Sequence, residues 1–293
     1  MDIHNLPDID EIVVSSLELF EKEGLPDLDL SGFKRPLVVG SGNAASTGKI
    51  LFDKKDAVFG DESNFEKKLE FVDGVIVISA SGMKASPSIT SKAMEKGLPV
   101  WLLTCNPDAP AKEHADKVIV SPKLVEPYTY NTSTYLGMLL SQTKENPRQI
   151  LDFIREKVDP LIPELNHYEA FFLIVPNEFD SARDLFLTKF DELFGPMLNG
   201  RCFTPEQAKH ARTLVSSPTE MFISFGYDNK DFGDSKLNIP LPANAGPAAL
   251  MAIGYYVIGK IQKQNPPYFK DSIESYAKKA SEIFGQDIKP IVD

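Results

Sequence analysis

The sequence is poor in the residues on which metal-binding and disulfide-stabilised proteins depend. Its 293 residues include two cysteines and four histidines. The cysteines, Cys105 and Cys202, lie in separate apolar segments, which is typical of reduced thiols in a cytoplasmic protein. No group of histidine, cysteine and aspartate residues has the spacing of metal ligands. We therefore expect free thiols and no bound metal.

Basic runs and long apolar runs are also missing. Thirty-one Lys and Arg residues stand against 42 Asp and Glu residues, a net charge of −11. A protein that binds nucleic acid or an anionic membrane needs a basic face, and no Lys/Arg run supplies one. The longest apolar stretch, residues 247–259, is too short to cross a bilayer, and the acidic first residues have no signal-peptide pattern. These absences predict a cytoplasmic protein that binds neither nucleic acid nor membrane.

What the sequence does contain is enough apolar material for a sizeable core, at 42% of the residues. Residues 9–23 place apolar groups at helical spacing before Gly24, which predicts an amphipathic helix. Continuous apolar strands then alternate with segments of helical length, a pattern typical of a parallel sheet covered on both faces. The expected strands are residues 36–40, 73–79, 98–104 and 116–121, and the expected helices between them are residues 44–53, 88–96 and 109–115.

The pattern restarts after a linker at residues 160–168. Helices are expected before it at 131–143 and 147–159. Strands are expected after it at 170–176, 219–226 and 237–242, and helices at 180–194, 247–263 and 268–284. The sequence thus predicts an α/β protein with two parallel-sheet domains, residues 1–150 and a shorter second domain, residues 151–293.

The first strand runs into a turn of glycine and serine residues before the next helix. Gly42, Asn43 and Ser46 belong to this turn, where small residues let the backbone approach a ligand and the helix N-terminus offers free N–H groups to an anion. The turn has neither the third glycine of a dinucleotide-binding loop nor the spacing of a P-loop. A ligand site and a simple tight turn are both compatible with it.

The second turn, residues 79–88, is the serine loop. Its hydroxyls follow a buried strand and precede a helix, where they can bind a phosphate together with backbone N–H groups. Ser86 or Ser88 could instead only cap the helix, but capping does not account for Ser79 and Ser81. We therefore favour a phosphate-type site formed by Ser79, Ser81, Lys84, Ser86 and Ser88.

Four ordered segments resemble the sugar isomerase (SIS) domain family: VVGSGNAAS, DGVIVISASG, GLPVWLLTCNPDAPAKEHADKVIV and EPYTYNTSTYLGMLLSQ. They cover roughly residues 30–145. The chain resembles the isomerase half of glutamine–fructose-6-phosphate amidotransferases, which carries two such domains. This resemblance implies two doubly wound, flavodoxin-like domains, the second abbreviated. The resemblance implies a phosphosugar ligand, bound by the two glycine/serine loops and by Ser133 and Thr134 at the start of a helix.

The resemblance extends to catalytic residues in the second half. Lys189-Phe190-Asp191-Glu192 and Glu206-Gln207-Ala208-Lys209-His210 resemble the family's K-x-x-E and E-L-K-H segments. This match implies that Glu192 moves a proton between C1 and C2 and that His210 opens the sugar ring. Lys189 and Lys270 would be the accompanying lysines. From the residues alone, an exposed i,i+3 ion pair and a surface histidine remain the alternatives.

Four features depart from the family pattern. Lys84 stands where the phosphate loop usually has threonine. Val175-Pro176-Asn177 replaces a G-R-G turn in the second domain, and a helix–strand unit there is missing. The glutaminase half is absent, so glucosamine synthesis from glutamine is not expected.

Two function classes follow from these observations. One is an enzyme: a phosphosugar isomerase, or a related aminosugar-phosphate isomerase or deglycase. The other is a non-catalytic phosphosugar-binding regulatory protein, which would need only the loops of the first domain. Isomerisation through an enediol needs no metal or nicotinamide, so we expect no cofactor. The apolar surfaces of residues 254–258 and of the N-terminal helix predict a homodimer.

Overall fold

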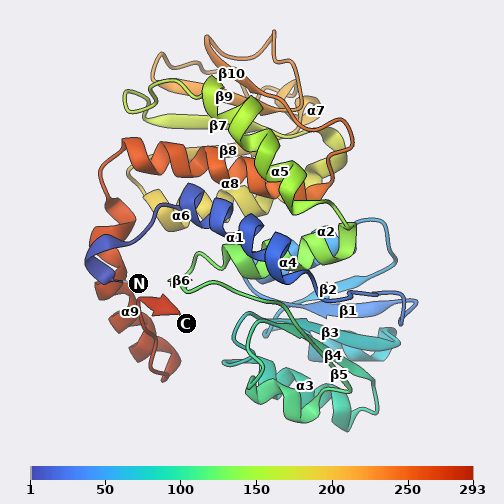
Figure 1. The fold of residues 1–293 in the computed structure, drawn as a ribbon. Helices are drawn as coiled ribbons and strands as arrows, with labels where there is room; N and C mark the ends of the chain where they lie inside the picture. The colour runs from blue at the N-terminus through green and yellow to red at the C-terminus, as the bar shows by residue number, and fades with distance from the viewer. Residues whose placement is uncertain (1, 293) are drawn as a thin grey trace.

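Two parallel sheets form the framework of the protein, which we describe over residues 2–292 of a computed structural model (Figure 1). The first sheet has five strands in the order β2-β1-β3-β4-β5, and every neighbouring pair is parallel. Its strands are β1 (Pro36–Val39), β2 (Val58–Gly60), β3 (Gly74–Ile78), β4 (Val100–Thr104) and β5 (Lys117–Val120).

Alternate residues of the central strands enter two separate cores. Val75 and Val77 of β3 pack with Ile89 and other residues of α3 (Ser86–Glu95) on the outer face. Ile76 and Ile78 point to the other face and join the large core shared with the helical layers. Because both faces are covered, these strands are continuously apolar, which is the property from which the sequence predicted a parallel sheet.

The second sheet has four parallel strands in the order β10-β9-β7-β8. Its inner face packs on α6 (Arg183–Phe194) and α8 (Pro247–Gln264) (Figure 1), and the short α7 (Pro205–Ala208) packs on its outer face through Ala208. The strands are β7 (Ala170–Ile174), β8 (Asn199–Phe203), β9 (Glu220–Phe225) and β10 (Ser235–Ile239).

A layer of helices joins the two sheets. Helix α1 (Ile9–Glu23) packs against α8 of the second half and against α4 (Thr132–Thr143) and α5 (Pro147–Phe153) of the first. The backbone N–H of Ile9, which begins α1, donates to the side chain of Gln262 in α8 at 3.0 Å. One continuous core therefore runs through both halves. The remaining helix beside the first sheet is α2 (Asn43–Leu51).

The last part of the chain returns to the first half. Helix α9 (Tyr268–Phe284) leads to a short strand, β11 (Ile291–Val292), which pairs antiparallel with β6 (Glu126–Pro127). Both ends of the chain lie beside α9 (Figure 1). No helix within residues 2–292 is long and apolar enough to cross a membrane.

The α/β architecture predicted from the sequence is confirmed, with differences in detail. Strands β2, β6, β8 and β11 were not predicted, and residues 110–114 form a 3₁₀ helix where a longer helix was expected. Residues 254–258 do not form an exposed apolar surface, because Tyr255 and Ile258 are buried and the ring of Phe186 lies against Gly254. The apolar face of α1 is likewise buried within the chain. These surfaces therefore give no support to a dimer.

Candidate functional site

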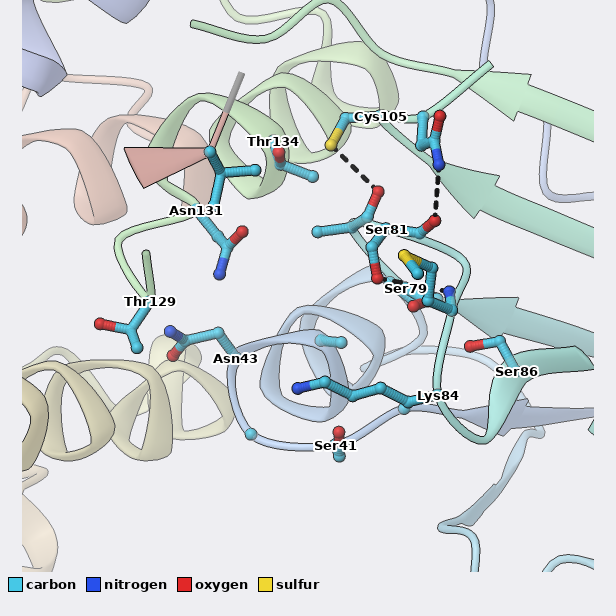
Figure 2. Close-up of a pocket in the computed structure, with 18 of the residues that line it drawn as sticks. Ser41, Asn43, Ser79, Ser81, Lys84, Ser86, Cys105, Thr129, Asn131 and Thr134 are labelled. Carbon is cyan, nitrogen blue, oxygen red and sulfur yellow. Dashed lines mark hydrogen bonds between the residues drawn. The ribbon is translucent and has the colours of Figure 1, made fainter. Parts of the chain in front are cut away.

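A cavity of about 980 Å³ opens where the strands of the first sheet end (Figure 2). Parallel sheets bind ligands at this edge, because the strand-to-helix turns there present backbone N–H groups and helix N-termini. The turns after β1, β3 and β4 form its floor, and α9 and β11 contribute the opposite wall. Nine of the predicted site residues line it: Gly42, Asn43, Ser79, Ser81, Lys84, Ser86, Ser88, Thr134 and Glu192.

The serine loop is folded tightly by its own hydroxyls. Ser79 Oγ accepts from the N–H of Gly82 at 3.1 Å, and Ser81 Oγ accepts from the N–H of Met83 at 3.3 Å. Gly82 has a φ of +62°, and a side chain there would collide with Ala109. Glycine is therefore required at this point of the loop. The loop ends at Ser86, the first residue of the ten-residue helix α3, whose N-terminus favours a bound anion.

The turn after β4 supports the serine loop through hydrogen bonds to two of its carbonyls. Thr104 Oγ1 and Cys105 Sγ both donate to the carbonyl of Ala80, and the Asn106 side chain donates to the carbonyl of Ser81. Burial raises the pKa of the Cys105 thiol, so it stays protonated and acts as a donor. Cys105 therefore supports the loop and is not set up as a nucleophile.

Asn43 and Glu192 bring the two halves of the chain together at the cavity. Asn43 Nδ2 lies 3.4 Å from Glu192 Oε2 and 3.5 Å from Oε1. The Asn43 side chain is 94% buried, and its Oδ1 has no hydrogen-bond partner among the described residues. A buried amide oxygen without a partner is costly, and a ligand hydroxyl entering the cavity could satisfy it.

Lys189 fixes the position of the Glu192 carboxylate. The Lys189 side chain is fully buried, and its ammonium donates to Glu192 Oε2 at 2.6 Å. It also donates to the carbonyls of Thr129 and Tyr130, each at 2.9 Å. All three of its N–H groups are therefore used. Lys189 itself does not line the cavity, whereas the Glu192 side chain is 24% exposed and does.

The turn whose carbonyls accept hydrogen bonds from Lys189 has a strained backbone. Thr129 has a φ of +78° and Asn131 a φ of +47°. A β-branched residue such as threonine rarely adopts a positive φ, and strain of this kind concentrates at functional sites. The Oγ1 atom of Thr129 is buried without a partner, and Figure 2 shows Asn131 and Asn43 on the same side of the cavity. Thr129 and Asn131 lie in the segment EPYTYNTSTYLGMLLSQ that resembles the family, but neither was among the site residues predicted from the sequence.

Ser46 and Ser133 lie behind the cavity and not in its lining. The hydroxyl of Ser46 donates to the carbonyl of Gly42 at 3.4 Å. The hydroxyl of Ser133 donates to Glu126 Oε1 at 2.6 Å, and Glu126 also accepts from the N–H groups of Thr132 and Ser133 at the start of α4. Burial raises the pKa of the Glu126 carboxyl. In this structure both serines support the surrounding turns.

His210 and Lys270 lie outside the cavity lining. The His210 side chain is 78% exposed and lies 3.8 Å from Glu206 Oε1, just beyond α7. Lys270 Nζ pairs with Asp8 Oδ1 at 2.9 Å and so joins α9 to the segment before α1. The structure therefore brings Glu192 to the cavity of its own chain but does not bring His210 or Lys270 there. No group of three metal-ligating side chains is found within residues 2–292.

Several solved structures share this architecture. The C-terminal domain of glucosamine-fructose-6-phosphate aminotransferase from Francisella tularensis superposes with a TM-score of 0.65 at 11% identity, over 89% of this chain and 94% of that one. Tagatose-6-phosphate ketose/aldose isomerase from Escherichia coli gives 0.61 at 12% identity, over 89% and 92% of the two chains. Glucosamine-6-phosphate deaminase from Thermotoga maritima gives 0.59 at 13%, over 87% and 91%.

Sequence comparison adds nothing to these structural matches. No protein-family model matches the chain, and no curated protein matches its sequence. At 11–13% identity the structural likeness concerns the fold. The chain has the double-sheet fold of the SIS-type phosphosugar isomerases, as the resemblance of its loops implied.

Proposed function

We propose that this chain is an enzyme that interconverts the aldose and ketose forms of a hexose 6-phosphate. One observation carries the proposal: the serine loop and the Glu192 carboxylate, more than 100 residues apart in sequence, open into the same cavity. The loop offers a phosphate site, and the carboxylate offers a base fixed in position. The fold is compatible with this chemistry, since the proteins that share it include an isomerase and a deaminase of sugar phosphates.

The two ends of the substrate would contact different halves of the chain. Its phosphate would bind the hydroxyls of the serine loop and the N-terminus of α3, because unpaired N–H groups and the helix dipole favour an anion there. Its hydroxyls would meet Asn43 Oδ1 and Thr129 Oγ1, the buried oxygen atoms that lack partners. This orientation places the carbonyl end of the sugar beside Glu192.

The reaction requires a single well-placed base for its central step. Glu192 would take the proton from C2 of the open-chain aldose, giving a cis-enediol, and return it to C1 as the hydroxyl proton moves from O2 to O1. Lys189 would hold the carboxylate still and offset its charge, since its ammonium cannot turn away from its three acceptors. An aminosugar-phosphate isomerase or a deglycase would use the same proton transfer on an amine-bearing substrate.

Ring opening would require a second copy of the chain. His210 is exposed and lies outside the cavity of its own chain, so it could serve only a cavity on another molecule. The proposal therefore includes a homodimer in which His210 of each chain enters the cavity of the other. In that arrangement the imidazole would transfer the proton between O1 and O5.

The position of His210 also favours the second candidate, a phosphosugar-binding regulatory protein. Such a protein needs the serine loop but no ring-opening group. A screen of hexose 6-phosphates and their amines separates the two, by thermal shift first and turnover second. A ligand at 100 times its Kd raises the free energy of unfolding by about 2.7 kcal/mol. Binding followed by turnover supports the enzyme, whereas binding without turnover of any of these sugars supports the regulatory protein.

A further inference from the structure

Lys84 places a positive charge in the serine loop. The family that this loop resembles usually has threonine at this position. The backbone of Lys84 is left-handed, with a φ of +55°. Figure 2 shows the side chain extending from the loop into the space between the loop and Asn43. Among residues 2–292, no carboxylate forms a salt bridge with it, so its charge remains available to an anion.

Two aromatic side chains hold the ammonium group of Lys84. It donates to the hydroxyl of Tyr128 at 3.0 Å and lies 4.0 Å from the ring centroid of Phe284. The first contact comes from the turn after β6 and the second from the last turn of α9. Lys84, Tyr128 and Phe284 all line the cavity.

Phe284 is itself fixed by the end of the chain. Helix α9 stops at this residue because Gly285 is left-handed, with a φ of +61°. The segment that follows is tied down by two bonds: Ile288 N–H donates to Ser281 Oγ at 2.9 Å, and Tyr128 N–H donates to the Pro290 carbonyl at 2.7 Å. The ring of Phe284 is still 47% exposed, so its position is not explained by burial in a core.

A lysine side chain on a surface loop normally has considerable rotamer freedom, and ordering it for a ligand costs entropy. A cation–π contact and a hydrogen bond in the free protein reduce that cost in advance. We propose that Phe284, together with Tyr128, is a positioning residue that holds the Lys84 ammonium in the cavity beside the serine loop, so that the last turn of α9 sets the affinity for the phosphate group of the substrate. The affinity part of this inference rests on the proposed function.

The first test is a set of binding measurements with fructose 6-phosphate and inorganic phosphate, by calorimetry. Phe284→Leu should weaken binding of both about two- to fivefold, the range of an exposed cation–π contact. Lys84→Met should weaken it about tenfold or more, because it removes the charge itself. Phe284→Trp should restore affinity. Phe71→Leu is the matched control, since Phe71 is also exposed, at 65%, but does not line the cavity.

The double variant shows whether the two residues act together. In the Lys84→Met background, Phe284→Leu should have no further effect, because the ring would have no ammonium left to position. Wild-type affinity in Phe284→Leu, or independent and additive losses in the double variant, would overturn the inference. Equal losses for unphosphorylated fructose would do the same, since the effect would then not concern phosphate.

A second measurement does not depend on any ligand. In the NMR spectrum of the free protein, the Lys84 side-chain methylene next to the ammonium should show a ring-current shift that disappears in Phe284→Leu and persists in Phe71→Leu. Absence of that shift in the wild type overturns the positioning of Lys84. If the shift is present but the wild type binds neither anion, the proposed function fails and the phosphate role of Lys84 fails with it, while the positioning itself stands.

Discussion

The two sheets of this protein end in different ways at their carboxyl edges. At the first edge, turns rich in glycine and serine surround a cavity, and buried oxygen atoms of Asn43 and Thr129 have no partner among the described residues. At the second edge, the corresponding side chains bond to one another. Asp180 Oδ1 accepts from both Arg183 and Gln207, and Gln207 forms a capping box with Thr204.

The difference shows that a parallel α/β sheet does not by itself make a ligand site. The depression at the second edge, between β9 and β10, measures about 340 Å³, roughly a third of the first cavity, and includes no serine. The Asn238 side chain in it already bonds to Asp228 and Ser224. The second half contributes to the first edge instead, through α6 and α9. Four predictions test this difference between the two edges.

The largest effect is expected at Glu192. Glu192→Gln keeps the size and hydrogen bonding of the side chain but cannot accept a proton, so turnover should fall by about two decades or more while phosphosugar binding stays near normal. Exchange of the C2 proton with deuterated water should stop as well. Asp191→Asn, on the exposed side of the same helix, is the control. Wild-type turnover in Glu192→Gln would show that the carboxylate is not the base.

The next effect concerns His210 and the second copy. His210→Ala should lose turnover of a cyclic sugar phosphate, by about a hundredfold if the imidazole is the ring-opening acid and base, and lose less with an open-chain substrate. Mixing His210→Ala with Glu192→Gln should restore activity, because a mixed dimer contains one cavity with both groups intact. Light scattering checks the dimer. A monomeric mass with unchanged turnover in His210→Ala would remove this residue from the mechanism.

The third prediction compares the stability contributed by a buried ion pair, Lys189–Glu192, with that of an exposed pair, Lys209–Glu206. Lys189→Met should lower the free energy of unfolding by about 1–3 kcal/mol, because it leaves the carbonyls of Thr129 and Tyr130 without donors. Lys209 pairs with Glu206 on the exposed surface of the second half, so Lys209→Met should leave stability unchanged within error. Urea denaturation of both variants measures the difference. Equal destabilisation would contradict the role given to the buried ammonium.

The smallest effect is expected for Ser81. Ser81→Ala should weaken binding of a phosphosugar about two- to tenfold, the range of one neutral hydrogen bond, and should leave binding of the free sugar unchanged. Ser91→Ala provides the comparison, since the Ser91 hydroxyl bonds only to Glu95 on the exposed side of α3. Equal weakening for both ligands would mean that the serine loop does not recognise phosphate.

The parts of the fold that the sequence predicted are those with strong local patterns. Strands β1 and β3 are fully buried and β4 is buried at all but one residue, and continuous apolar runs mark all three. Strand β8 was missed because it contains Arg201, whose charge is offset only in the folded protein by bidentate pairing with Glu220 of β9, on the far side of β7. Strand β2 is three residues long and only partly buried. Neither has a period that could be read from the residues.

The lining of the cavity was predictable only where a single turn supplies it. The serine loop follows directly from a strand, hydroxyls and a helix start. Thr129 and Asn131 were not predicted as site residues, because the sequence shows neither their left-handed backbone nor the contact between the Lys189 ammonium and the Thr129 carbonyl. The wall contributed by α9 was missed for the same reason, since Phe284 meets Lys84 across 200 residues of chain.

The hydrogen bonds from Lys189 to the carbonyls of Thr129 and Tyr130 affect whether the first half of the chain can form the cavity without the second. Lys189 belongs to α6, which follows the first half in the chain. Residues 1–150 made alone would therefore have the serine loop but would lack the ammonium that bonds the turn at Thr129 and Tyr130. Such a fragment would also lack the Glu192 carboxylate, which lines the cavity of the whole chain. If the chain acts on a sugar phosphate as proposed, its preference for the sugar phosphate over inorganic phosphate would therefore depend on α6 as well as on the serine loop.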